Sequence, residues 1–350
     1  MKILVYATAF SGTGGIETHL MNFCEKMSGR VSIDLVIPRC NMTGEQRQTV
    51  SGFCKRTDFF SSPVPQLRSL WLLMKLMMRS GTCYDALYTN GQGNSISMVG
   101  SLIRHRRWIH HHHTSGDGAD ARKWSPAYFN AMKRVDRLIA CSTRNAETMG
   151  VILGRKVDSV KYLTTQISIQ KHGYEGRPLR FGFFGRLIRE KGIDVLARLS
   201  NDEACQDIEW HIWGEGDQYP PRFFERYPKI IKHDAFRDAH GLRNALSVLD
   251  AYVLFSTNNE GLPLALLECM GAGVPWISSD RGGIRDVVCD PSGTMMIPEN
   301  FDYETAKEAV LRLARNLRSG EFRPDSLVNY YNAYLSPEVI CRKWMECFTA

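Results

Sequence analysis

The chain has 350 residues, 43% of them hydrophobic, and a formal net charge of +7 at pH 7. This length exceeds what a single hydrophobic core usually supports, so the sequence predicts two domains of roughly 150 to 200 residues each. No apolar run of about 18 residues occurs, and the first residues do not form a secretory signal. We therefore expect no membrane-spanning segment and a cytoplasmic location.

The positive charge is concentrated in the first half of the chain. Residues 1–170 hold 22 Lys and Arg against 11 Asp and Glu, a net charge of +11, whereas the remaining residues carry −4. A basic half can face nucleic acid, an anionic membrane or an acidic ligand. No zinc-finger spacing, RNA-binding aromatic signature or long Lys/Arg run is present, so we expect no nucleic-acid partner. The ten cysteines are scattered and are expected to be reduced.

The first half alternates predicted strands and helices. The strand Lys2 to Ala9 is followed by the glycine-bearing turn SGTGG and by a helix whose apolar residues have helical spacing, Ile16, Leu20, Phe23 and Met27. This order is the opening of a doubly wound parallel sheet. Further strands are predicted at 31–38, 86–90, 107–112 and 137–142, and helices at 67–78, 94–104 and 126–136.

The second half repeats this order. Strands are predicted at 179–185, 208–214, 230–233, 251–256 and 275–279, with helices after Lys191, at 239–247, after Glu260 and from Tyr303 onward. Between residues 165 and 178 the apolar periodicity is lost and turn residues appear. We therefore predict an α/β protein with two Rossmann-like domains facing a cleft, at 1–170 and 171–335. A C-terminal helix at 336–350 is expected to pack back onto the first domain.

Two carboxylates, Glu260 and Glu268, flank the apolar segment EGLPLALLE. Proline is favoured in the first turn of a helix, so Pro263 places Glu260 in the loop at the helix N-terminus. A carboxylate inside an apolar helix is costly unless something pairs with it. The N–H groups of Gly261 and Leu262 and the helix N-terminus form an anion site between the acids. This layout matches a nucleotide sugar, although a helix-terminal charge and a solvated Glu would give the same pattern.

A basic loop follows the first strand of the second half. The sequence FGFFGRLIREKG places Gly185 and Arg186 at the strand end and Lys191 in the next loop, where ligands bind in parallel sheets. Arg186 and Lys191 can neutralise a diphosphate leaving group without a metal, and no Asp-x-Asp pair that would hold one is present. We expect no metal and no other cofactor. A basic loop is also often only solvated surface.

Together these segments resemble the retaining glycosyltransferases of family 4, which have the GT-B fold. The E-x7-E element of that family matches Glu260 to Glu268, and its donor-phosphate element matches GRLIREKG. The segments GTGGIETHL, WGEGD and GGIRDVV match as well, so the resemblance spans nearly the whole chain. Two departures are the segment FSTNN before Glu260, where the family tends to have Pro-Ser, and Asp286, where many members carry Glu.

The resemblance implies a role for each matching residue of the second half. Glu268 is expected to bind the ribose of the donor, and Arg186 and Lys191 its diphosphate. Glu260 is expected to bind the donor sugar together with the backbone of Gly261, Leu262 and Pro263. The expected reaction moves a sugar from a nucleoside diphosphate sugar, with UDP as the first choice, to a hydroxyl of a growing glycan in cell-surface polysaccharide or lipopolysaccharide. The anomeric configuration is retained as the family implies.

In the first half the resemblance points to two glycines and a histidine. Gly14 and Gly15 are expected to keep the first loop compact beside the donor phosphate and the acceptor. The family usually has a histidine just past a strand, and here that strand runs into WIHHHHTSGD. His113 is the first candidate and His112 the second. Consecutive histidines in an extended segment alternate faces, so the four cannot all bind one metal.

The expected catalytic residues are thus His113, Glu260, Arg186 and Lys191, with the cations stabilising the departing diphosphate. No carboxylate is obviously placed as a nucleophile, which favours same-face attack assisted by the leaving phosphate. A dehydrogenase is disfavoured because Glu17 stands where its fingerprint has a third glycine. A nucleotide-sugar epimerase, a sugar phosphorylase and a catalytically silent nucleotide-sugar-binding subunit remain alternatives.

The segment RSLWLLMKLMMR, residues 68–79, is hydrophobic with basic ends. It either packs against the first sheet or lies on the surface as a helix that dips into an anionic leaflet. Because the first half carries a charge of +11, we expect peripheral association with the inner leaflet of a membrane. A lipid-linked glycan is then the expected acceptor.

Overall fold

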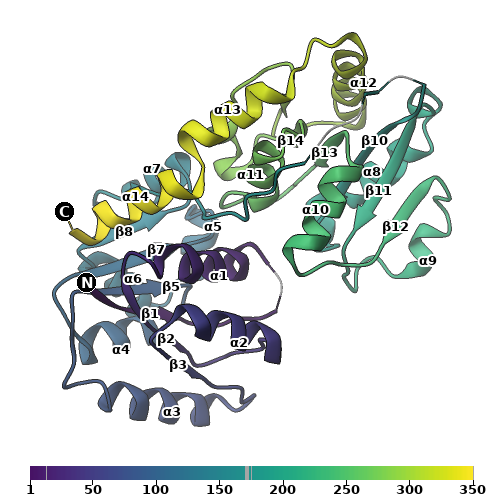
Figure 1. Cartoon of the computed structure of the whole chain (residues 1–350). Helices are drawn as coiled ribbons and strands as arrows, with labels where there is room; N and C mark the ends of the chain where they lie inside the picture. The colour runs from purple at the N-terminus through teal and green to yellow at the C-terminus, as the bar shows by residue number, and fades with distance from the viewer. Residues whose placement is uncertain (13, 170–172, 175, 350) are drawn as a thin grey trace. The chain divides into compact units, whose positions relative to one another are not determined.

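The computed structural model describes residues 1–12, 14–169, 173–174 and 176–349, which form two compact units (Figure 1). The first unit consists of Met1–Leu163 with Ile340–Ala350, and the second of Thr164–Val339. The second unit begins before the expected boundary at 170/171, because residues just before that point bond within it. The Thr164 hydroxyl lies 2.6 Å from that of Tyr331, and Arg243 donates to the Ser168 carbonyl over 2.7 Å.

A parallel seven-stranded sheet, in the order β3-β2-β1-β5-β7-β8-β9, forms the centre of the first unit as described. Its order reverses between β1 and β5, and ligands bind at such switch points in doubly wound sheets. The strands are β1 (Lys2–Ala7), β2 (Ser32–Ile37), β3 (Arg56–Phe59), β5 (Ala86–Asn90), β7 (Trp108–His112), β8 (Arg137–Ala140) and β9 (Asp158–Ser159). A separate short pair is formed by β4 (Cys83–Tyr84) and β6 (Arg104–His105).

Helices cover both faces of this sheet. They are α1 (Gly15–Met27), α2 (Gly44–Phe53), α3 (Pro65–Met77), α4 (Ser95–Leu102), α5 (Gly118–Ala121), α6 (Pro126–Arg134), α7 (Thr143–Leu153) and α14 (Pro337–Thr349). Alternate residues of β1 enter two different apolar clusters, Ile3 and Val5 in one and Leu4 and Tyr6 in the other. The cluster around Ile3 also contains Trp344 of α14, so the C-terminal helix completes the core of the first unit.

Helix α2 and strand β3 were not predicted from the sequence. Helix α2 buries only Val50, so its apolar periodicity is weak. It begins instead with a capping box, in which the Thr43 side chain accepts from the N–H of Gln46 and the Gln46 side chain accepts from the N–H of Thr43. A local hydrogen-bond motif defines this helix where hydrophobicity does not.

The second unit contains a six-stranded parallel sheet in the order β12-β11-β10-β13-β14-β15, counted over the described residues. Its strands are β10 (Leu179–Phe184), β11 (Ile208–Trp213), β12 (Ile230–His233), β13 (Ala251–Leu254), β14 (Trp276–Ser279) and β15 (Thr294–Ile297). Its order reverses between β10 and β13. The prediction of two doubly wound parallel sheets is therefore confirmed.

The helices of the second unit are α8 (Ile193–Ser200), α9 (Pro221–Phe224), α10 (Ala239–Val248), α11 (Leu264–Gly271), α12 (Tyr303–Ser319) and α13 (Pro324–Tyr334). Short 3-10 segments occur at η1 (Arg189–Lys191), η2 (Glu203–Cys205) and η3 (Gly282–Val287). Within the described part of the chain, no helix is long and apolar enough to cross a membrane.

Candidate functional site at the carboxyl edge of the second sheet

The basic loop, residues 185–192, joins β10 to α8 at the switch point of the second sheet. Arg186 is exposed, and its guanidinium has no partner among the residues that the structure describes. Gly192 has a φ of 72°, and a Cβ there would lie 2.3 Å from the carbonyl oxygen of Phe255. Glycine at this position therefore lets the basic loop approach the end of β13.

Glu260 lies in the loop between β13 and α11, residues 255–263, and faces Lys191. The Lys191 Nζ is 2.7 Å from Glu260 Oε1 and 2.9 Å from Oε2, and the two side chains are 19% and 15% exposed. The hydroxyl of Ser256 also lies 2.6 Å from Glu260 Oε1. The structure thus brings the predicted sugar-binding acid into an ion pair with a predicted phosphate-binding cation.

The backbone of Glu260 rests on a glycine pair from another element. The N–H of Gly283 donates to the Glu260 carbonyl over 3.1 Å. Gly282 has a φ of 56°, and a Cβ on it would lie 1.7 Å from that same carbonyl oxygen. The GGIRDVV segment therefore has a structural purpose, because its first glycine leaves the space in which the Glu260 loop lies.

Glu268 has different surroundings. It lies inside α11 and is 8% exposed, and no described residue makes a hydrogen bond or ion pair with its carboxyl group. Burial raises the pKa of Glu268 from 4.5 to about 8. This carboxyl is therefore mainly protonated at pH 7, and a polar ligand that bonds to it would remove the cost of its burial.

The segment between the two acids is a loop that leads into α11. Helix α11 starts at Leu264 with Pro263 as its N-cap residue, so Glu260 lies outside the helix as the proline indicates. Leu262 is buried and Gly261 half-buried. Gly261, Leu262 and Pro263 thus connect Glu260, which is paired with Lys191, to the helix that contains Glu268.

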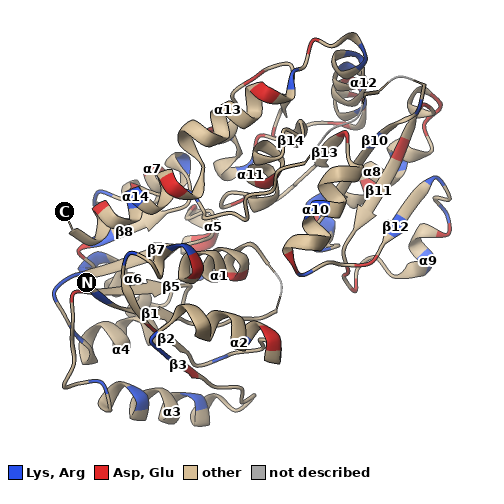
Figure 2. Ribbon diagram, in the orientation of Figure 1, with Lys and Arg blue, Asp and Glu red and all other residues tan. Residues whose placement is uncertain are grey.

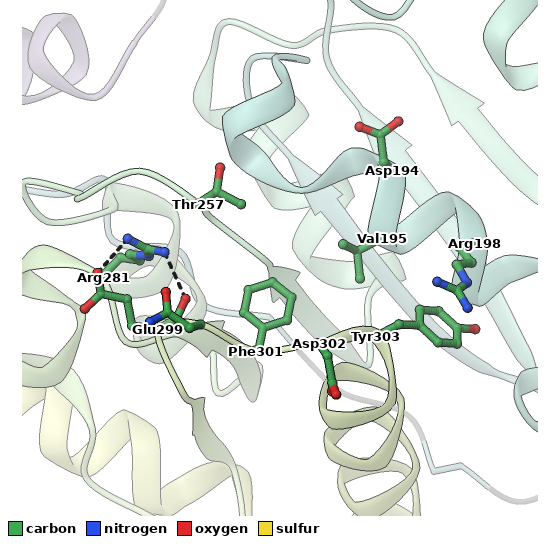
Figure 3. A pocket seen from close by; sticks show the side chains of 10 residues that line it. Asp194, Val195, Arg198, Thr257, Arg281, Glu299, Phe301, Asp302 and Tyr303 are labelled. Carbon is green, nitrogen blue, oxygen red and sulfur yellow. Dashed lines mark hydrogen bonds and ion pairs between the residues drawn. The ribbon is translucent and has the colours of Figure 1, made fainter.

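A pocket of about 550 Å³ lies nearby at the carboxyl ends of β13, β14 and β15, beside α8 and α12 (Figure 3). Its charged side chains have partners within the unit. Arg281 donates to Glu299 over 2.7 Å, and the Arg198 guanidinium lies 3.6 Å from the ring centroid of Tyr303. None of the predicted site residues lines this pocket, and we assign no ligand to it.

In the first unit, the two predicted glycines lie at the start of α1. Gly15 is the first helical residue, and Gly14 is the extended N-cap residue. A Cβ on Gly14 would lie 2.7 Å from Glu17 Oε2, and Glu17 Oε1 accepts from the N–H of Ser11 over 3.1 Å. Glu17 therefore folds back onto this loop. Thr13, in the middle of the glycine turn, lies outside the described residues.

The histidines of β7 alternate between two faces, as predicted. His110 Nε2 and His112 Nδ1 each lie 2.8 Å from the hydroxyl of Tyr128 on one face. On the other face, His111 Nδ1 lies 3.1 Å from the hydroxyl of Tyr88. Among the described residues, no group of His, Cys, Asp and Glu side chains is arranged to hold a metal ion.

His113 lies just past β7 and is 5% exposed. Its Nδ1 is 3.2 Å from the Tyr162 hydroxyl, while its Nε2 is buried without a partner among the described residues. Burial, followed by the nearby imidazole of His19, holds the pKa of His113 well below its usual range, so the ring is neutral. His112 instead bonds to Asp120, with 2.8 Å between Nε2 and Oδ2.

Sequence reasoning missed Ser256, Tyr162 and Asp120. Each contacts a predicted site residue, but none was assigned a role from the sequence. Ser256 lies four residues before Glu260, within the FSTNN departure, and was the easiest to find. Asp120 and Tyr162 reach the histidines only because the chain folds, and nothing in their sequence neighbourhood marks them.

Two family models match the chain. Residues 178–316 match the model described as Glycosyl transferases group 1, and residues 13–157 match the model described as Glycosyltransferase Family 4. The first of these regions contains the basic loop, the Glu260 loop and α11. The second contains most of the first sheet with Gly14, Gly15 and His113.

Among curated proteins, WcaL of Salmonella typhimurium, named for colanic acid biosynthesis, is 28% identical over 182 residues, covering 43% of each chain. A GDP-mannose-dependent alpha-mannosyltransferase of Mycolicibacterium smegmatis is 29% identical over 190 residues, covering 51% of this chain and 48% of that protein. The chain thus spans about half the length of the curated relatives it matches, or somewhat less. The crystal structure of Anabaena HepE with UDP-glucose has a similar fold, with a TM-score of 0.76 at 15% identity over 99% of both chains.

Proposed function

Because the chain belongs to the family 4 glycosyltransferases of the GT-B fold, we propose that it transfers a sugar from a nucleoside diphosphate sugar to a hydroxyl of a growing glycan. The observation that carries this proposal is the set of charged side chains in the second unit, around the carboxyl edge of its sheet. There a buried acid and an exposed arginine, neither with a side-chain partner among the described residues, occur in one unit with a lysine–glutamate pair. The name of WcaL supports a cell-surface polysaccharide as the product, with lipopolysaccharide as the alternative.

The proposed donor is a UDP-sugar. The HepE structure contains UDP-glucose, which supports this choice, whereas the mycobacterial relative is named for its use of GDP-mannose. In the proposed complex the ribose hydroxyls bond to the carboxyl group of Glu268, with which no described residue makes a hydrogen bond or ion pair. These bonds favour the ionised carboxylate, so donor binding releases a proton below pH 8.

Arg186 and Lys191 are the proposed ligands of the diphosphate. Arg186 is exposed without a described partner and needs no rearrangement to meet an anion. Lys191 is already paired with Glu260, so the diphosphate and Glu260 compete for its charge. The proposal includes no metal, because the two cations and the N-terminus of α11 stabilise the leaving group. Addition of EDTA should leave the activity unchanged.

Glu260, with the backbone of Gly261 to Pro263, is the proposed site of the donor sugar. We include retention of the anomeric configuration, by same-face attack of the acceptor hydroxyl assisted by the leaving phosphate. In the first unit, Gly14 and Gly15 are proposed to lie beside the donor phosphate and acceptor, and His113 beside the reacting sugar. The neutral ring of His113 suits it to hydrogen bonding rather than to charge stabilisation.

The experiment that tests this function is a donor-hydrolysis screen across UDP- and GDP-sugars, with the anomer of the released sugar followed by NMR. Glu268→Ala should lower the hydrolysis rate at least about 100-fold at limiting donor, because the ribose loses a charged acceptor. Glu225→Ala, which changes an exposed glutamate of the same unit, is the control. Product formed from donor alone as an isomeric nucleotide sugar would indicate an epimerase, and binding without turnover a silent subunit.

Peripheral membrane association is a second proposal, and α3 supports it. This helix buries Leu72 and Leu76 against the first sheet, so the packing interpretation holds for one face. Its other face exposes a stripe of large apolar side chains, Leu67, Leu70, Leu73, Met74, Met77 and Met78. Leu70 is 66% exposed and Met77 65%, which is unusual for a surface without a partner.

Two basic residues of the segment 68–79, Lys75 and Arg79, pair with Asp58 of β3, whereas Arg68 donates to the Ser62 carbonyl over 3.3 Å. Lys75 Nζ lies 2.9 Å from Asp58 Oδ1, and Arg79 is buried and paired with the same carboxylate. The outward face of α3 is therefore apolar rather than basic. Lys and Arg elsewhere on the first unit, blue in Figure 2, provide the attraction to an anionic leaflet that we propose as the occupant of this stripe. A lipid-linked glycan is then the proposed acceptor.

A further inference from the structure

Ser256 is a fully buried serine two residues beyond the end of β13, and its hydroxyl has three acceptors within reach. Glu260 Oε1 is 2.6 Å from the hydroxyl oxygen, the Glu190 carbonyl 3.0 Å and the Asn258 carbonyl 3.2 Å. A hydroxyl has one proton to donate. The carboxylate is both the closest and the charged acceptor of the three, so it receives that proton in preference to the carbonyls.

The backbone of Ser256 is itself held by neighbouring elements. The hydroxyl of Ser279, at the end of β14, donates to the Ser256 carbonyl over 2.6 Å. The N–H of the next residue, Thr257, donates to the Glu190 carbonyl over 2.9 Å. The backbone that carries this hydroxyl is therefore fixed by hydrogen bonds to two neighbouring segments, whereas Lys191 reaches Glu260 through a flexible side chain.

These two contacts respond differently when a diphosphate binds. The diphosphate competes with Glu260 for Lys191, because one ammonium group cannot neutralise both anions fully. It has no comparable attraction for Ser256, which is neutral and buried. When Lys191 turns to the diphosphate, the Ser256 hydroxyl continues to hold the Glu260 carboxylate.

Resting on the proposed function, we infer that Ser256 is a positioning residue for the donor sugar. It keeps the carboxylate of Glu260 directed at the sugar hydroxyls while Lys191 engages the diphosphate. Ser256 belongs to the FSTNN segment, where the chain departs from the Pro-Ser of its family. The sugar-binding geometry of Glu260 thus depends on a contact within this segment.

The test compares a nucleotide sugar with its nucleoside diphosphate by isothermal titration calorimetry. The probes are UDP-glucose with UDP, and GDP-mannose with GDP, and the pair that the unmodified protein binds is used. In Ser256→Ala the affinity for the nucleotide sugar should fall about five- to twenty-fold, because the carboxylate of Glu260 is no longer held toward the sugar hydroxyls. The affinity for the nucleoside diphosphate should stay within about twofold, because only the sugar reaches Glu260. Ser256→Thr, which keeps a hydroxyl, should restore most of the lost affinity.

Ser278→Ala is the matched control. Ser278 is equally buried, and its hydroxyl donates to the Leu254 carbonyl over 3.0 Å. This variant should bind both ligands normally. If Ser256→Ala does not fold, Ser256→Cys, which fills the same space with a weaker donor, replaces it with the same expectation.

Three results would overturn the inference: unchanged binding in Ser256→Ala, an equal loss for both ligands, or the same selective loss in Ser278→Ala. If the unmodified protein binds neither pair, the proposed donor class is wrong, and the inference that depends on it is wrong as well. The two failures are thus distinguished by the behaviour of the unmodified protein.

Discussion

Two glutamates eight residues apart illustrate how the environment decides the state of a side chain. Glu260 is partly buried and shares an ion pair with Lys191, so its charge is compensated within the protein. Glu268 is more deeply buried and unpaired among the described residues, and its pKa rises to about 8. A protein that buries an uncompensated acid within a helix loses stability there, which a ligand can restore.

The raised pKa of Glu268 predicts how the stability of the ligand-free protein depends on pH. The pKa of Glu268 in the folded state is above its unfolded value of 4.5. Its contribution to the free energy of unfolding is therefore complete below pH 4.5 and is lost as the pH rises through about 8. Glu268→Gln cannot ionise and should not show this loss. Urea unfolding should therefore show that the free energy of unfolding of Glu268→Gln, relative to that of the parent protein, rises by up to about 4 kcal/mol between pH 5 and pH 9. Parallel curves would show that Glu268 titrates normally.

Gly282 permits a second prediction at this scale. Its φ of 56° and its contact with the Glu260 carbonyl leave no space for a side chain. Gly282→Ala should lower the free energy of unfolding by about 2 kcal/mol or more, and should lower donor hydrolysis because the Glu260 loop is displaced. Gly44→Ala is the control, since a Cβ on Gly44 meets no atom within 4 Å. Equal effects of the two substitutions would contradict the role assigned to Gly282.

Whole elements show how one segment can serve two surfaces. Alternate histidines of β7 lie on opposite faces of the sheet, and on each face they form hydrogen bonds with tyrosine hydroxyls. Helix α3 divides in the same way, with Leu72 and Leu76 in the core and an apolar stripe in solvent. The pairing of Lys75 and Arg79 with Asp58 fixes which face of α3 is outward. Helical periodicity alone predicts two faces but not which partner each one finds.

The exposed stripe of α3 predicts a loss of vesicle binding on polar substitution. The double variant Leu70→Gln and Met77→Gln should reduce the fraction bound to phosphatidylglycerol-containing vesicles at least about tenfold, because two large apolar side chains no longer insert. Flotation at low salt is the measurement, and Val151→Gln, at a residue 85% exposed on α7, is the control. Should the parent protein itself stay in the soluble fraction, the membrane proposal is wrong. A concentration-dependent dimer would instead indicate a second copy on the stripe.

At the scale of the whole molecule, the chain forms two units, and the first of them consists of two separate segments of the sequence. The first unit is completed by residues that follow the entire second unit in sequence. Trp344 of α14 is fully buried against Phe23 and Tyr88, with ring centroids 5.4 and 4.9 Å apart. The core of the first unit is therefore complete only when α14 packs into it.

Removal of the Trp344 side chain should destabilise the first unit selectively. Trp344→Ala is expected to cost about 3–5 kcal/mol, the usual range for a large aromatic residue in a core. Hydrogen exchange followed by mass spectrometry should show faster exchange in peptides from β1, α1 and β5, with little change in peptides from β10 to β15. Arg342→Ala, at an exposed position of the same helix, is the control. Faster exchange throughout both units would show that they unfold together.

Sequence alone was sufficient for the two doubly wound sheets, the helix that follows the Glu260 loop and the alternation of the β7 histidines. These features depend on apolar periodicity, turn residues and strand geometry, which are local and can be read from neighbouring residues. The family motifs also placed Glu260, Glu268, Arg186 and Lys191 in one half of the chain.

Only the tertiary structure decided which of these residues meet and in what state. Lys191 pairs with Glu260 from 69 positions away, Asp58 pairs with Lys75 and Arg79, and Glu268 is left without a described partner. The boundary between the units after Leu163 and the packing of α14 in the first unit also depend on contacts between residues that are far apart in the sequence. Burial and charge pairing depend on atoms that are distant along the chain, and periodicity within a segment carries no information about them.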